Sequence, residues 1–180
     1  MLTQQGGLVK TTLILGFFIV AASFSTAAAQ WQDAGKLNVW TTATVSRITN
    51  SADSIYLTRV RAAKNDGFDR IVFEFTGGMP SYQIEYVKSG VFENTGEQKI
   101  RVGGKAFLDV NLQSLPYPES KTAKDAAIPK GNQKLAVFNE IREIEWFEGV
   151  RDFGIGLNAK RQFRVQELLN PIRLVIDFKH

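Results

Sequence analysis

Cysteine is absent from the chain of 180 residues, and histidine occurs once, as the C-terminal residue His180. Without cysteine there is no disulfide framework, no thiol nucleophile and no lipid-modified cysteine behind an export signal. A Ser-His-Asp or Cys-His arrangement would lack its base or its nucleophile, because a residue at a chain end is usually disordered. The usual zinc ligands are also nearly missing. We therefore expect no nucleophilic or zinc-dependent enzyme, no metal and no cofactor.

Sequence motifs for hydrolysis and phosphate binding are missing as well. There is no Gly-x-Ser-x-Gly, no His-Glu-x-x-His and no phosphate-binding glycine loop. Paired carboxylates remain, and glycoside hydrolysis needs only two acids at a defined separation. Any domain with 18 acidic residues would meet that condition, so a hydrolase acting on a glycan is an alternative and not our expectation. The acids considered for it are Asp69, Glu74, Glu140, Glu143, Glu145, Glu148, Asp152 and Asp177.

The first 29 residues have the organisation of a secretory signal peptide. Lys10 precedes an apolar run at residues 13–22, and small residues lead to Ala27-x-Ala29. We expect cleavage between Ala29 and Gln30 and a periplasmic or extracellular location. The alternative is a retained membrane anchor, although the run has only about half of the roughly 20 residues that a spanning helix needs. No stable anchor is therefore expected after cleavage.

The charge and length of the remaining chain are those of an ordinary small domain. Cleavage leaves 151 residues (180 − 29), enough for one domain with a proper core. The formal net charge of the whole chain, +4, is mild and its charges are interspersed, so nucleic acid is not an expected partner. We predict a polar spacer or edge strand at residues 30–54 and one β domain at residues 55–180.

Two short runs resemble each other closely. Residues 70–75 read Arg-Ile-Val-Phe-Glu-Phe, and residues 173–178 read Arg-Leu-Val-Ile-Asp-Phe. Both are rich in the β-branched and aromatic residues that strands favour. Because side chains alternate along a strand, the acids Glu74 and Asp177 fall on the face opposite the second, fourth and sixth residues of each run. We predict that these apolar residues point into the core.

The rest of the chain predicts an all-β protein. Strands are expected at residues 55–63, 70–75, 81–87, 99–102, 106–112, 149–157, 161–168 and 173–178. Residues 135–147 favour two short strands with a change of phase near Arg142, with a helix as the alternative. Residues 114–134 hold three of the five prolines and predict a surface loop. The fold class is therefore a compact β-sandwich or open barrel of two similar small sheets, with about nine to eleven short strands.

Aromatic and arginine side chains suit a binding role. Tyrosine and tryptophan can stack on sugar rings or peptide stems if they face solvent, and arginine can hold a carboxylate by two parallel hydrogen bonds. The competing interpretation is structural, because an arginine and an acid within one strand often form a partly buried pair. The candidate ligand-binding residues are Arg61, Asp69, Arg70, Glu74, Tyr82, Tyr86, Trp146, Glu148, Arg173 and Asp177.

Several motifs together resemble the AMIN-like domain of exported bacterial proteins, over residues 55–178. The most specific are Gly-Phe-Asp-Arg at residues 67–70 and Pro-x-Arg-Leu-Val at residues 171–175. That domain is related to the AMIN domain of periplasmic N-acetylmuramoyl-alanine amidases and pilus secretins. The resemblance implies a compact β-sandwich of two similar small sheets, with residues 70–75 and 173–178 as equivalent strands of the two sheets, and a non-catalytic role at the cell wall. The absence of cysteine departs from the lipoprotein members, and no catalytic domain is recognisable.

Two functions in addition to hydrolysis follow as expectations. The first is an exported, non-catalytic domain that binds peptidoglycan or a related envelope glycan. The second is a module that binds an envelope protein through a free strand edge or the loop at residues 114–134.

Overall fold

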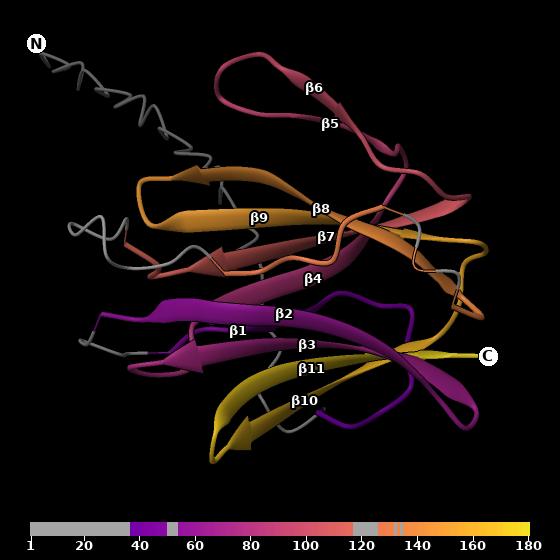
Figure 1. The fold of residues 1–180 in the computed structure, drawn as a ribbon, viewed down its shortest axis with the longest axis horizontal. Helices are drawn as coiled ribbons and strands as arrows, with labels where there is room; N and C mark the ends of the chain where they lie inside the picture. Colours follow the sequence, from indigo (N-terminus) through magenta and orange to yellow (C-terminus); the bar gives the residue numbers. More distant parts are fainter. Residues whose placement is uncertain (1–36, 50–53, 117–125, 132, 134) are drawn as a thin grey trace, which may run out of the picture. The chain divides into compact units, whose positions relative to one another are not determined.

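The structure is a computed structural model that describes residues 37–49, 54–116, 126–131, 133 and 135–180 (Figure 1). These residues all belong to one unit, Trp31–His180. The predicted signal peptide and most of the predicted loop at residues 114–134 lie outside the described residues. Within the described part, no helix is long and apolar enough to cross a membrane.

The predicted all-β class is confirmed, because the described residues form eleven strands and no helix. All strand pairs within the sheets are antiparallel. The strands are β1 (Val45–Arg47), β2 (Tyr56–Asn65), β3 (Phe68–Thr76), β4 (Ser81–Val87), β5 (Val91–Glu93), β6 (Lys99–Arg101), β7 (Ala106–Gln113), β8 (Phe138–Phe147), β9 (Val150–Leu157), β10 (Phe163–Leu169) and β11 (Ile172–Lys179).

Two larger sheets pack face to face around one core, as the two layers of ribbons in Figure 1 show. The four-stranded sheet has the order β10-β11-β3-β2, and the five-stranded sheet has the order β1-β4-β7-β9-β8. Side chains from both inner faces meet between them; the Phe73 and Phe153 rings, for example, lie edge to face with centroids 5.4 Å apart. This arrangement is a β-sandwich, in agreement with the predicted fold class.

The two similar runs lie in neighbouring strands of one sheet, and the expectation that they belong to two related sheets is wrong. β3 pairs directly with β11, so that Arg173 lies opposite Glu74 and Asp177 opposite Arg70. The prediction for their apolar faces is confirmed, since the six residues concerned are at most 3% exposed. An antiparallel pair of Arg-x-x-x-acid runs brings each arginine beside the acid of the other strand, which favours this pairing.

Within residues 135–147 the structure has one strand, β8 (Phe138–Phe147), and no helix. Register shifts mark irregularities between Phe138 and Glu140 and between Glu143 and Glu145. The predicted change of phase is therefore present, but it occurs on both sides of Arg142. It lets apolar side chains of both alternation phases reach the interior.

The glycines of β9 are covered by the β5–β6 hairpin, of which only β6 was predicted. A Cβ on Gly154 would lie 2.8 Å from the Phe92 ring, and one on Gly156 would lie 2.0 Å from the backbone oxygen of Gly103. Alternating glycines along a strand allow another group to approach its backbone closely, and here that group is another part of the same chain. These glycines are explained by packing.

We expect Gly156→Ala to destabilise the fold by about 1–3 kcal/mol, because the backbone of Gly103 has to move to admit a methyl group. Urea unfolding of the protein measures this loss. Gly96→Ala is the matched control, since its Cβ would meet nothing closer than Asn94 Oδ1 at 3.4 Å, and we expect a change within about 0.5 kcal/mol. Equal losses in the two variants would contradict the close packing of the hairpin.

Candidate functional site

The outer face of the four-stranded sheet carries two arginine-acid groups, each centred on one carboxylate. Asp177 on β11 lies directly between Arg164 on β10 and Arg70 on β3. Glu74 on β3 lies directly between Arg173 on β11 and an arginine of β2. Both groups arise because antiparallel pairing places the two similar runs in complementary register. They differ in how far their charges are satisfied.

The group around Asp177 is closed. Arg70 donates to both carboxylate oxygens at 2.6 and 2.9 Å, and Arg164 and Gln166 donate at 2.8 and 2.9 Å. Asp177 is fully buried, and its hydrogen bonds raise the pKa of the Arg70 guanidinium above its ordinary value. A buried carboxylate with four donors is a structural centre with no remaining capacity for a ligand.

Aromatic rings cover this closed group. The Arg164 guanidinium carbon lies 4.6 Å from the centroid of Trp40, and the Arg70 guanidinium carbon lies 5.0 Å from that of Phe68. Such cation–π contacts add to the ion pairs. The segment that carries Trp40 is held by a hydrogen bond from Thr41 N to Phe163 O at 2.8 Å. Trp40 therefore packs onto the domain.

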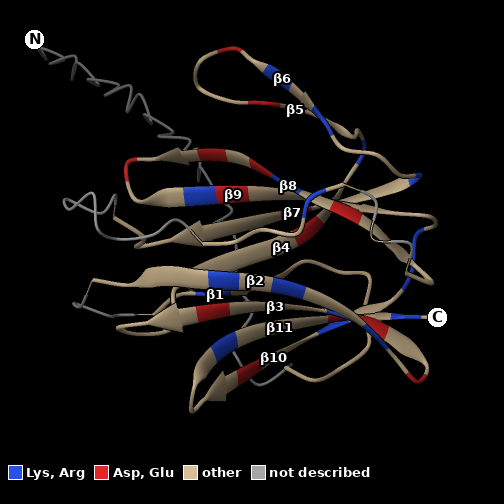
Figure 2. Cartoon of the chain, in the orientation of Figure 1, with Lys and Arg blue, Asp and Glu red and all other residues tan. Residues whose placement is uncertain are grey.

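The group around Glu74 is open. Arg59 and Arg173 lie opposite Glu74 on either side, and Arg61 donates to it from Nη2 at 3.0 Å. The side chains of Arg61 and Glu74 keep 50% and 28% exposure. Within the described residues, neither Arg59 nor Arg173 has a carboxylate partner within 4 Å. Figure 2 shows this group as blue segments on β2 and β11 on either side of a red segment on β3.

A shallow groove of about 460 Å³ adjoins the open group. It lies between β2 and residues 127–129, which run beside β2 and accept a hydrogen bond from Val60 N at 3.1 Å. Arg59 and Arg61 line it together with Val60, Ala62, Ala127, Ile128 and Pro129. Apolar walls next to guanidinium groups are the usual composition of a ligand-binding surface.

Two further predicted residues are buried inside the sandwich. Asp69 is fully buried and accepts hydrogen bonds from Val137 N at 2.5 Å and Phe138 N at 2.9 Å. Burial alone would raise its pKa, but these bonds and the His180 ring outweigh burial and lower the pKa of Asp69. Tyr82 is 1% exposed and donates to Glu167 at 2.8 Å. Both residues join the two sheets and are inaccessible to a ligand.

The remaining predicted residues lie away from the open group. Tyr86 donates to Arg161 O at 2.6 Å and is half-buried. Trp146 donates to Leu115 O at 2.8 Å, and Arg151 stacks on its ring at 4.1 Å. Glu148 is exposed in the β8–β9 turn with a φ of 49°. Five of the ten candidates, Arg61, Arg70, Glu74, Arg173 and Asp177, therefore share one face, and the other five do not.

Several residues of this face were not predicted. Arg59, Arg164 and Gln166 complete the two acid-centred groups, and alternation along each strand would have placed them on an outer face. Assigning them to one site requires the order of the strands, which alternation does not provide. The structural interpretation paired Arg70 with Glu74 and Arg173 with Asp177 within each strand. In the structure Arg70 pairs with Asp177 and Glu74 pairs with Arg61, both across strands. His180, expected to be disordered, lies 2.9 Å from Asp69 Oδ1.

The opposite outer face, on the five-stranded sheet, is acidic. Asp109 on β7 lies opposite Glu85 on β4. Asp152 on β9 is the diagonal neighbour of Asp109 across the β7–β9 pair. Burial, with the nearby carboxylates of Asp152 and Glu85, raises the pKa of Asp109 to about 6. The described residues contain no group of three metal-binding side chains. The two outer faces thus carry opposite charge.

The domain is an all-β sandwich with one closed and one open arginine-acid group on the outer face of its four-stranded sheet. A model of the AMIN-like domain matches residues 55–180, more than half of the chain, and the chain therefore belongs to the AMIN-like domain family. Members of this family are envelope domains of exported proteins, typically related to peptidoglycan and generally non-catalytic. No curated protein and no solved structure matched the chain.

We expect Asp177→Asn to cost about 3 kcal/mol of unfolding free energy, because it leaves two guanidinium groups without their counter-charge. The loss lies at the low end for buried pairs, since Arg70 and Arg164 keep 30% and 22% exposure. Glu74→Gln, the matched control in the open group, should cost about 0–1 kcal/mol. Urea unfolding compares them, and similar losses would contradict the distinction between a closed and an open group.

The raised pKa of Asp109 predicts a pH dependence of stability. Between its ordinary value of 3.8 and about 6 the folded state binds more protons than the unfolded state, so stability falls as pH rises through this window. We expect Asp109→Asn to increase stability at pH 7 by on the order of 1 kcal/mol and to flatten the curve between pH 4 and 7. Glu93→Gln, on exposed β5, is the control. An unchanged dependence of stability on pH in Asp109→Asn would contradict the raised pKa of Asp109.

Proposed function

We propose that this chain is an exported, non-catalytic module that binds peptidoglycan or a related anionic envelope glycan. The outer face of the four-stranded sheet holds the site, at the open group of Arg59, Arg61, Glu74 and Arg173. Residues 1–29 direct export and are removed by cleavage after Ala29. The working protein then acts in the periplasm or outside the cell.

The observation that carries this proposal is the excess of guanidinium groups over carboxylates in the open group. Three arginines surround Glu74, and only Arg61 forms a hydrogen bond with it. Arg173 has one long contact, from Nε to Pro171 O at 3.3 Å. Arg59 and Arg173 are thus available to a carboxylate, and the stem peptides of peptidoglycan carry carboxylates. A planar guanidinium holds such a group in a fixed geometry.

The adjoining groove supplies the apolar part of the contact. Ile128 and Pro129 stand opposite β2 across the groove, where they can pack against the apolar face of a sugar ring or an alanine methyl group. A ligand would place its acid beside Arg59 and Arg61 and its apolar portion against this wall. A few charged groups beside apolar surface orient the ligand.

A hydrolase gains no support from the buried acids. Asp69 and Asp177, two of the candidate acids, are fully buried and hydrogen-bonded. Glycoside hydrolysis needs two acids that reach the same glycosidic bond. A turnover assay on wall fragments with the exported protein tests this alternative directly, and we expect no turnover.

We expect the exported protein to sediment with purified sacculi at low and moderate salt. Arg59→Ala combined with Arg173→Ala should weaken its apparent affinity by about tenfold, equivalent to about 1.4 kcal/mol. The loss should shrink at high salt, because exposed charges are screened. The measurement is the bound fraction as a function of sacculus concentration.

The matched control replaces two exposed basic residues elsewhere, Lys88→Ala and Arg101→Ala. It should bind as the unmodified protein does. Protein that remains in the supernatant at both salt concentrations would refute glycan binding. Equal weakening of binding by the control pair would refute the proposed site but would not refute glycan binding.

A further inference from the structure

The edges of the two large sheets are protected to different extents. At one edge of the four-stranded sheet, Ala127 O accepts a hydrogen bond from Val60 N of β2. At its other edge, Asn38 N and Thr41 N donate to carbonyls of β10 at 2.7 and 2.8 Å. Proteins cover such edges because unpaired backbone groups attract other strands. The five-stranded sheet ends in β1, which has three residues, and in β8, which has ten.

One backbone hydrogen bond from outside the sheet reaches β8 near its beginning. Gln133 N donates to Asn139 O at 2.9 Å. Among the described residues, none outside β9 forms a backbone hydrogen bond with residues 141–143. Within the part of the chain that the structure describes, this stretch is therefore a short strand edge with no backbone partner beyond β9.

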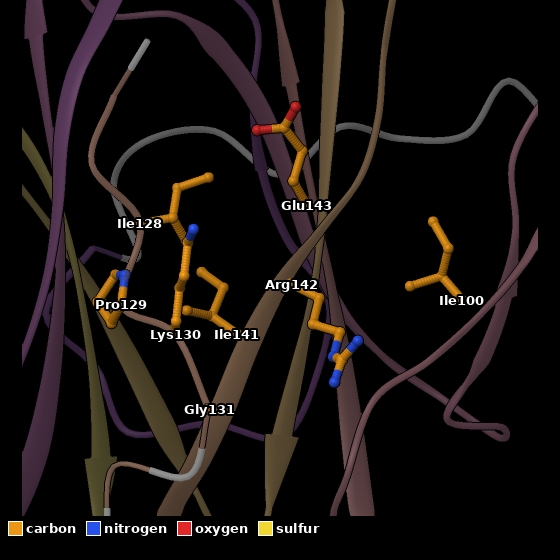
Figure 3. Close-up of a pocket in the computed structure, with 8 residues that line it drawn as sticks. All are labelled: Ile100, Ile128, Pro129, Lys130, Gly131, Ile141, Arg142 and Glu143. Carbon is orange, nitrogen blue, oxygen red and sulfur yellow. The ribbon is translucent and has the colours of Figure 1, made fainter.

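A cavity of about 420 Å³ runs along this open stretch. Figure 3 shows Ile128, Pro129, Lys130 and Ile141 on one side of the β8 ribbon, and Arg142 and Ile100 on the other. Residues 128–131 line the cavity without bonding to residues 141–143. The backbone of an additional strand therefore has space beside β8. A volume of this size lies within the range of ligand pockets, roughly 300–1,000 Å³.

The charges at the cavity favour an acidic occupant. Glu143 is already bound by Arg151, through Nε at 3.0 Å and Nη2 at 2.5 Å. Lys130 has no ion pair with a described residue, and Arg142 has only a long contact with Glu140 at 3.4 Å while its side chain keeps 53% exposure. Two cations thus remain beside an apolar wall of isoleucine and proline.

We propose that the open edge of β8 binds an extended peptide segment of a partner protein by strand addition. Successive side chains of such a segment point to opposite sides of the sheet. One side chain faces Ile128 and Ile141 and has to be apolar. The next lies on the side of Arg142 and is acidic. The site therefore selects a segment with alternating apolar and acidic residues.

The irregularities of β8 limit this pairing to a short segment. Register shifts occur between Phe138 and Glu140 and between Glu143 and Glu145. They interrupt the regular ladder of hydrogen bonds on either side of residues 141–143. A long strand of another molecule cannot continue past them, which protects the edge from uncontrolled association. A segment of a few residues fits between them.

The test is a titration of the isotope-labelled exported protein with the peptide acetyl-Ser-Val-Glu-Val-Glu-Val-Ser-amide, followed by amide chemical shifts. We expect the largest shifts at residues 141–143 and at Ile128. Two more peptides serve as comparisons: one with lysine in place of both glutamates, and one with alternate amides N-methylated. N-methylation removes backbone donors, so binding by strand addition should be lost.

Lys130→Glu combined with Arg142→Glu should lower the affinity for the acidic peptide by about tenfold or more. The same variant should bind the lysine peptide more tightly than the acidic one. The matched control, Lys88→Glu with Lys105→Glu, should leave the affinity for both peptides unchanged. Sacculus binding should be unchanged in both variants, because none of the four substituted residues lines the glycan groove.

Three results would each overturn the proposal. They are no shift at residues 141–143 at millimolar peptide, equal binding of the N-methylated peptide, and equal weakening by the control pair.

Discussion

The structure depends on the register in which β3 and β11 pair. Their similar runs lie antiparallel, so that Asp177 falls between Arg70 and Arg164 and its buried carboxylate receives four hydrogen bonds. A slip by one residue would turn every side chain of a strand to the opposite face, placing charges in the core. It would also leave a buried carboxylate without its partners, which is strongly unfavourable. The ion pairs and the apolar core therefore specify the same register.

This pairing divides the outer face into a structural half and an available half. Asp177 uses Arg70 and Arg164, and the rings of Trp40 and Phe68 cover them. The equivalent acid, Glu74, is partly exposed and binds only one of its three neighbouring arginines. The same motif thus stabilises the sheet at one end and leaves positive charge at the other. The proposed glycan site adjoins β2 and the proposed peptide site adjoins β8, and Ile128 and Pro129 line both of them.

Much of the fold could be predicted from alternation, whereas the site could be predicted only in part. Period-2 patterns located the inner face of β3 and β11 and the strand β4, because local backbone geometry sets the direction of each side chain. Short β5 was missed, since three residues in a polar, glycine-containing stretch show no clear alternation. The aromatic candidates Tyr82 and Trp146 suited sugar stacking by chemistry, but each has a hydrogen-bond partner inside the fold. Residue type does not reveal whether a polar tip meets solvent or protein.

The sequence by itself determined the all-β class, the buried faces of the strands and the family, because these depend on residue type and on spacing within a few residues. Only the tertiary structure decided which strands are neighbours, and therefore that Arg70 binds Asp177 and that Arg59 lies beside Glu74. Strand order can join residues far apart in the sequence, such as Arg70 and Asp177 at a separation of 107 positions, and many orders satisfy the same alternation. It is settled by the combined packing of both sheets, and that packing also decides which arginines remain available.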